Sequence, residues 1–137
     1  MTATVLLLES EPSLRKVVAA SLKQTGLRII EAEDAEDARS RLEEESPDLF
    51  VLELDHPAGE HGALIDAYRQ RSDEGAVVLT TTERPKEGWR HRYRPEAIVY
   101  KPYDVRLLSR RIRRLIQGDK QMEGSTSGGA TDDPNDR

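Results

Sequence analysis

Short apolar-rich runs recur along the chain, and polar or turn-forming residues bound each of them. Such runs are typical of buried strands, and they occupy residues 5–8, 27–30, 49–55, 76–79 and 97–100. Most of the stretches between them carry apolar residues three and four positions apart, a spacing that predicts amphipathic helices. Strands and helices therefore alternate five times, which predicts an α/β fold: a doubly wound five-stranded parallel sheet with helices on both faces.

Capping residues mark the expected helix boundaries. Ser10 or Ser13 is expected to cap the first helix, and Gly26 is expected to end it. Asp34 is a suitable cap for a second helix, whose apolar stripe is thin. Asp104 is a suitable cap for the last helix, in which Arg106, Arg110, Arg113 and Arg114 lie mostly outside the apolar stripe.

Three segments depart from the regular pattern. Residues 57–62 are expected to form a loop before a short third helix. Residues 83–94 contain Pro85 and Gly88 and lack a helical period, so a helix there should be short or distorted. Residues 118–137 have almost no apolar side chains, which predicts a disordered tail or linker.

Composition restricts the class of protein. The 137 residues suit one folded domain, expected over residues 1–117, and the absence of cysteine excludes disulfides and thiolate metal sites. No apolar run is long enough for a signal peptide or a membrane span, so we expect a soluble, cytoplasmic protein. No complete catalytic set is visible, so we do not expect an enzyme.

Charge divides the chain into two unlike parts. Residues 1–83 carry 8 Lys/Arg against 18 Asp/Glu, a net charge of −10, whereas residues 84–114 carry 11 against 3, a net charge of +8. An acidic part and a basic part within one small domain predict two different surfaces.

Polar side chains follow the expected strands at the point where each strand ends. Because the carboxyl ends of parallel strands meet at one edge, where ligands bind in open α/β sheets, these residues should lie together. They are Glu9, Ser10, Glu11, Glu53, Asp55, Thr80 and Lys101.

This ordered set resembles the receiver domain of two-component response regulators, over roughly residues 4–117. Residues 48–62 are similar to the third strand and following loop of that family, with Pro57 four residues after the acceptor position. Residues 100–104 are similar to its Lys-Pro-aromatic turn, which implies a cis peptide before Pro102. The resemblance implies a flavodoxin-like fold and a role in phosphorelay signal transduction.

The resemblance also implies a role for each strand-end residue. Glu53 stands at the position of the phosphoacceptor Asp, and Thr80 and Lys101 stand at the positions that bind the phosphoryl oxygens. Glu9 and Ser10 stand at the acidic pair that holds Mg²⁺, and the Asp55 position supplies a further metal ligand.

Three of these positions differ from the family pattern. Glu53 replaces the acceptor Asp, Ser10 replaces the second acid, and Ile98 occupies the position of the aromatic switch residue. A glutamate places its carboxylate about 1.5 Å, one bond length, further out than an aspartate does, and gains a rotamer. These differences predict an atypical pseudo-receiver that acts independently of phosphorylation, with a weak or absent metal site and no other cofactor.

In that hypothesis Glu53 pairs with Lys101 and accepts a hydrogen bond from Thr80. The alternative for Glu53 is a merely solvated acid at the rim. A rival hypothesis retains phosphorylation by a histidine kinase, at Asp55 or at Glu53. A metal site at His56 and His61 is a minor alternative, because the spacing matches no ligand motif and loop histidines are usually exposed.

The basic part is expected to form the interaction surface. In the resembling family the fourth helix, fifth strand and fifth helix form the output and dimer face. An acidic signalling protein is the expected partner, a homodimer is a second arrangement, and nucleic acid is a third alternative, which the acidic remainder of the domain disfavours. The residues expected there are Arg84, Lys86, Trp89, Arg90, Arg92, Tyr93, Arg94, Arg106, Arg110 and Arg113.

Overall fold

The computed structural model describes residues 2–54, 58–72 and 74–118. Five strands form one parallel sheet in the order β2-β1-β3-β4-β5. They are β1 (Thr4–Leu8), β2 (Arg28–Ala32), β3 (Leu49–Glu53), β4 (Ala76–Thr81) and β5 (Ala97–Tyr100). The predicted fold class is confirmed, and β2 and β5 are the two edges of the sheet.

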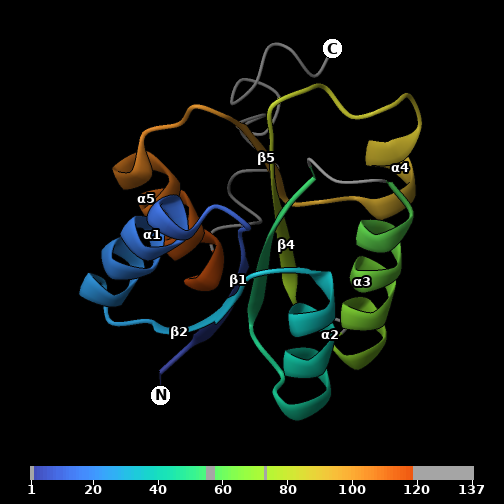
Figure 1. The fold of residues 1–137 in the computed structure, drawn as a ribbon. Coiled ribbons are helices and arrows are strands. Elements are labelled where there is room, and N and C mark those ends of the chain that lie inside the picture. Colours follow the sequence, from blue (N-terminus) through green and yellow to red (C-terminus); the bar gives the residue numbers. More distant parts are fainter. Residues whose placement is uncertain (1, 55–57, 73, 119–137) are drawn as a thin grey trace.

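Helices cover both faces of the sheet (Figure 1). One face carries α1 (Pro12–Gln24) and α5 (Val105–Ile116). The other face carries α2 (Ala35–Glu44), α3 (Ala58–Arg71) and α4 (Trp89–Tyr93). In Figure 1, α1 and α5 lie on the left of the sheet, and α2, α3 and α4 lie on the right.

Burial explains why the central strands β3 and β4 are so apolar. Every described residue of β3 and β4 is buried, because helices cover both faces at the centre of a parallel sheet. Alternate side chains enter different cores: Phe50 and Leu52 pack beneath α2 and α3, whereas Leu49 and Val51 pack beneath α1 and α5. Glu53 continues the second series, so its side chain falls on the α1 and α5 side of the sheet.

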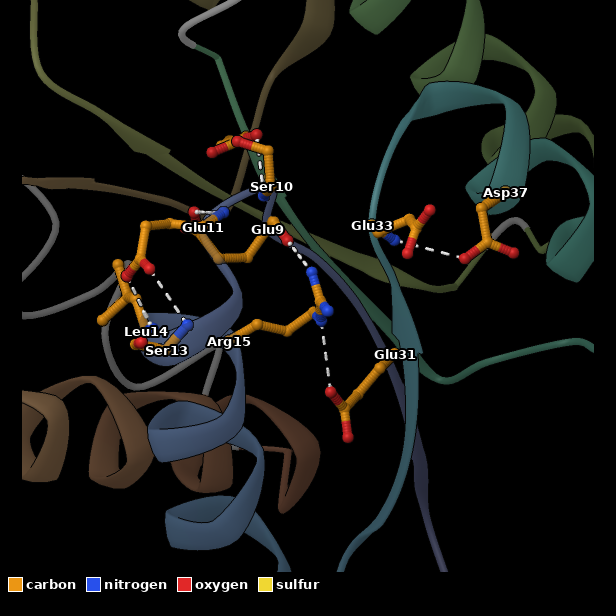
Figure 2. Close-up of polar contacts among 10 residues, drawn as sticks. Glu9, Ser10, Glu11, Ser13, Leu14, Arg15, Glu31, Glu33 and Asp37 are labelled. Carbon is orange, nitrogen blue, oxygen red and sulfur yellow. Dashed lines mark hydrogen bonds and ion pairs between the residues drawn. The ribbon is translucent and has the colours of Figure 1, made fainter.

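Helix caps agree with the sequence at two positions and differ at one. Asp34 caps α2 by accepting a hydrogen bond from Asp37 N, and Asp104 caps α5 by accepting one from Arg106 N. The expected cap of α1 by Ser10 or Ser13 is wrong. Glu11 is the cap, and its carboxylate accepts from the backbone N–H groups of residues 13 and 14 (Figure 2).

Other boundaries differ from expectation by a few residues. The expected loop 57–62 is wrong from residue 58 on, because α3 already begins there and runs for 14 residues. β2 lies one to two residues further along, and β4 extends two residues further, into the threonines. The expected tail lies outside the described residues, except for Gly118.

The fourth helix is short, as the sequence predicts. It has five residues, and residues in left-handed conformation stand at both ends: Gly88 with φ 85° and Arg94 with φ 46°. Trp89 and Tyr93 lie one turn apart with ring centroids 4.4 Å from each other, and both rings pack against the core beneath α3. These contacts hold a helix that is too short to be stable alone.

Candidate functional site

The strand-end residues lie at the carboxyl edge of the sheet. Glu53 is the last residue of β3, and Thr80 lies directly opposite it in the β3–β4 ladder. Glu9 follows β1, and Lys101 follows β5. The peptide between Lys101 and Pro102 is cis, as the resemblance implies. Asp55 lies outside the described residues.

Glu53 is held by contacts on both of its carboxylate oxygens. Its Oε1 lies 3.3 Å from the ammonium of Lys101, and its Oε2 accepts a hydrogen bond of 3.0 Å from the backbone N–H of Ser10. The residue is 1 % exposed. The predicted pairing with Lys101 is therefore confirmed, and the alternative of a solvated acid at the rim is wrong. The hydrogen bond predicted from Thr80 stays a prediction.

Glu9 supplies a second buried carboxylate to the same ammonium. Its Oε1 lies 3.0 Å from Lys101 Nζ, and its Oε2 accepts from the backbone N–H of Glu11 at 2.9 Å. Because Glu9 is only 2 % exposed, its charge depends on these donors rather than on water. Two buried carboxylates on different strands thus converge on one lysine.

Arg15 adds a second cation beside this cluster, and sequence reasoning missed it. Its Nη1 donates to the backbone carbonyl of Glu9 at 2.8 Å, and its Nε lies 3.2 Å from Glu31 Oε1 at the end of β2 (Figure 2). The side chain is largely buried between α1 and β2. No motif announces this contact, because Glu9 takes part through its main chain and Glu31 is 16 residues away.

The burial of this cluster changes the proton affinity of its members. Burial raises the pKa of the Glu9 carboxyl, and the negative charge of Glu53 raises it further. The donors on Glu11 and Lys101 offset only part of that rise. Burial alone would lower the pKa of Lys101, but the hydrogen bond and charge of Glu9, together with Glu53, raise it above its ordinary value.

Tyr103 lies beside the cluster and senses the same charges. Burial and then the negative charge of Glu9 raise the pKa of its hydroxyl to about 12. Its ring packs in the core beneath α1 and α5. Tyr103 therefore stays neutral at ordinary pH.

The described residues that the resemblance assigns to Mg²⁺, Glu9 and Ser10, do not fit that ion well. A divalent cation between Glu9 and Glu53 would face the ammonium that already bridges them. Ser10 brings no charge, and Glu11 uses both carboxylate oxygens to cap α1. Among the described residues, no group of three or more His, Cys, Asp or Glu side chains comes together as a metal site.

For the alternative of a metal site at His56 and His61, the structure describes only His61. His61 lies inside α3 and is 1 % exposed, so the expectation of an exposed loop histidine is wrong for this residue. Because α3 begins at residue 58, His61 is a helical residue, and its side chain is buried. His56 lies outside the described residues.

The expected basic surface divides into exposed cations and partly buried rings. Every arginine and lysine assigned to it is exposed, on α4, at its C-terminal cap, on α5 or in the connection before α4. Because β5 is an edge strand, α4 and α5 flank the same edge of the sheet. Trp89 and Tyr93 are only partly exposed, because both rings pack against the core beneath α3. Their place in the interaction surface stays a prediction. Arg92 pairs with Asp66 at 3.1 Å and covers the ring of Tyr93.

Known proteins similar to this chain include transcriptional regulatory proteins. The chain is 30% identical over 118 residues to the virulence transcriptional regulatory protein PhoP of Salmonella typhimurium, covering 82% of this chain and 51% of that protein. It is 29% identical over 135 residues to the transcriptional regulatory protein AfsQ1 of Streptomyces coelicolor, covering 93% and 57%. The chain thus spans about half the length of these curated relatives. No protein-family profile matches it.

A solved structure gives the same fold. The CheY-like response regulator receiver domain protein of Methanospirillum hungatei superimposes with a TM-score of 0.78 at 16% identity, covering 90% of this chain and 99% of that one. At this identity the likeness concerns the fold. Together with the sequence relatives, it shows that this chain is similar to the receiver domains of response regulators. No helix among the described residues is long and apolar enough to cross a membrane.

Proposed function

We propose that the domain is an atypical receiver that works as a phosphorylation-independent protein-interaction module. The observation that carries this proposal is the position of Lys101, whose ammonium bridges the buried carboxylates of Glu9 and Glu53. The ammonium that would receive phosphoryl oxygens is therefore already shared by two carboxylates. One of the two belongs to Glu53, at the acceptor position itself.

The geometry of Glu53 supports the same proposal. In-line phosphoryl transfer requires an oxygen placed to within a fraction of an ångström, and both Glu53 oxygens are held by donors from other segments. Attack by Oε2 would break its bond to Ser10 N, and attack by Oε1 would break the ion pair. In charge the carboxylate resembles a phosphorylated acceptor, although it carries one negative charge where a phosphoryl group carries nearly two.

The burial of Ile98 supports the proposal that the output surface keeps one arrangement. The residue is 3 % exposed and packs in the core beneath α3 and α4. A branched aliphatic side chain in that position has no polar end to exchange between a buried and an exposed state. We therefore propose that the α4–β5–α5 surface keeps one arrangement and binds an acidic signalling protein through its exposed cations. On this proposal the domain performs no catalysis.

A phosphorylation assay tests the proposal. After incubation with acetyl phosphate and Mg²⁺, the purified chain is expected to show no shifted band on a Phos-tag gel and no mass increase of a phosphoryl group. A shifted band would overturn the proposal. If Asp55→Asn removed that band, the acceptor would be Asp55; if Glu53→Gln removed it, the acceptor would be Glu53. An unrelated, phosphorylatable receiver treated in parallel shows that the reagent is active.

A further inference from the structure

A pocket lies between the first turn of α1 and the connection from β5 to α5. Its volume is about 380 Å³, within the range of about 300–1,000 Å³ that is typical of small-molecule sites. Leu14 contributes from α1, Thr82 follows β4, and the remaining lining residues follow β5. The complete lining is Leu14, Thr82, Lys101, Pro102 and Tyr103. The pocket therefore shares no residue with the basic surface.

The walls of the pocket are largely apolar. Leu14 and Tyr103 pack against the core beneath α1 and α5, and Pro102 adds a further apolar ring. Tyr103 supplies an aromatic ring, and aromatic rings attract one another when they are offset or meet edge to face. Thr82 and Tyr103 bring the uncharged hydroxyl groups of the lining. Such walls suit a small ring compound with a hydrogen-bonding group.

The charges around the pocket disfavour an ionic ligand. Lys101 is the one cation of the lining, and its ammonium lies 3.0 Å from Glu9 Oε1 and 3.3 Å from Glu53 Oε1. An anionic ligand would compete with these two buried carboxylates for the ammonium. No acid is among the described residues that line the pocket, so a cationic ligand would lose water without gaining a carboxylate. An uncharged ligand avoids both costs.

Hydrogen bonds hold the walls of the pocket in place. Leu14 N donates to the carboxylate of Glu11 at 2.8 Å (Figure 2), and Lys101 N donates to Thr81 O at 2.8 Å. Asp104, directly after the lining residues, caps α5 with its carboxylate. The pocket is consequently formed before a ligand arrives, which lowers the entropic cost of binding.

We propose that this pocket binds a small, uncharged aromatic molecule. The rings of the molecule lie between Leu14 and Tyr103, and a polar atom bonds to a hydroxyl group of the lining. The bound molecule joins the segments that follow Glu9 and Lys101, so it stabilises the folded state. The inference goes beyond the proposed function, because it gives the domain a chemical input that needs no phosphoacceptor.

A matched pair of dyes tests the inference. N-phenylnaphthylamine is uncharged and fluoresces strongly in apolar surroundings, and anilinonaphthalene sulfonate has the same rings with an added sulfonate. The uncharged dye is expected to bind the purified chain with a saturable rise in emission and to raise the midpoint of thermal unfolding. At the pocket the sulfonate dye should bind at least about tenfold more weakly, because Lys101 is already paired.

Amide NMR spectra show where each dye binds. The uncharged dye is expected to shift the amide signals of Leu14, Thr82 and Tyr103. The sulfonate dye is expected to shift signals of the exposed arginines on α5 instead. This readout separates the pocket from the basic surface, so attraction of the sulfonate to other positions does not obscure the result.

Substitutions that fill the pocket give a second readout. Leu14→Trp is expected to weaken binding of the uncharged dye by about tenfold, because the larger side chain occupies its place. Val17→Trp is the matched control on the same helix, at a position that is 55 % exposed and outside the lining, and should change the affinity by less than about twofold. Thr82→Trp fills the pocket from an exposed position, so it remains informative if Leu14→Trp fails to fold.

Three results would overturn the inference. One is the absence of saturable binding of the uncharged dye up to its solubility limit. Another is an equal loss of affinity in Leu14→Trp and Val17→Trp. The third is that both dyes shift the amide signals of the pocket at the same concentrations. The phosphorylation assay measures a different property, so the proposed function can fail while ligand binding holds, and the reverse.

Discussion

Lys101 and Glu53 form an ion pair of 3.3 Å between the ends of β5 and β3, across the intervening strand β4. Glu9 approaches the same ammonium from β1 at 3.0 Å, so one lysine joins three strands at the carboxyl edge. The cluster is therefore a structural element of the sheet as well as the candidate site. Its contribution to stability can be measured separately from any signalling role.

Removal of the lysine charge is expected to destabilise the fold. Lys101→Met leaves two nearly buried carboxylates without their shared cation, and loss of one member of a buried pair costs about 3–5 kcal/mol. Urea unfolding followed by circular dichroism would give the change in free energy. The double variant Lys101→Met/Glu53→Gln should recover part of the loss, because it removes one of the unpaired charges. Equal stability of wild type and Lys101→Met would contradict the arrangement.

Glu9 should make stability depend on pH in a defined direction. Its pKa is raised in the folded state, so the folded protein holds this proton more tightly than the unfolded chain does. The contribution of Glu9 is thus fully present below the unfolded pKa, near 4.5, and is lost as the pH rises through the folded pKa. The free energy of unfolding of the wild type minus that of Glu9→Gln should therefore decrease between pH 4 and pH 7. The opposite trend would show that the hydrogen bonds donated to Glu9 lower its pKa more than burial raises it.

Glu11 is expected to stabilise α1 as its cap. Glu11→Ala removes the acceptor for two backbone N–H groups and should cost about 1 kcal/mol, measured by thermal or urea unfolding. Ser13→Ala is the control at the position that the sequence suggested as a cap, and it should change stability by less than half as much. A larger effect at Ser13 than at Glu11 would place the cap elsewhere.

Arg69 is expected to hold the C-terminal end of α4. Arg69→Met removes its donors to three carbonyl oxygens and should cost about 1–3 kcal/mol, with faster hydrogen exchange in α4. The emission of Trp89, the single tryptophan of the chain, would report the loosening. Arg71→Met makes the same substitution on the exposed side of α3 and serves as control. Unchanged exchange in Arg69→Met would show that the packed rings alone hold the helix.

The parts of the fold that periodicity controls could be predicted from the sequence. The buried run of β3 and the α5 stripe through Leu108 and Ile112 follow directly from apolar spacing. The start of α3 could not be predicted, because Gly59 and Gly62 resemble turn residues, and Gly62 is small for a different reason: Tyr93 lies against it. That contact joins residues 31 positions apart and leaves no local signal.

Part of the candidate site could likewise be predicted from the sequence, and part could not. The strand-end rule placed Glu9, Glu53 and Lys101 at one edge, and side-chain alternation along the strands decides which face they share. The contact of Arg15 with the Glu9 carbonyl and the use of Glu11 as a cap depend on rotamers and main-chain geometry, which spacing does not encode.

The strand order gives the molecule an electric dipole across its sheet. Residues 28–45, which include the β2 edge and α2, carry 8 acidic against 3 basic side chains, whereas the β5 edge is flanked by the basic helices α4 and α5. A charged partner would be turned by this field before contact, so that its acidic side meets the β5 edge first. The rate of association should consequently fall with rising ionic strength much more than the rate of dissociation rises.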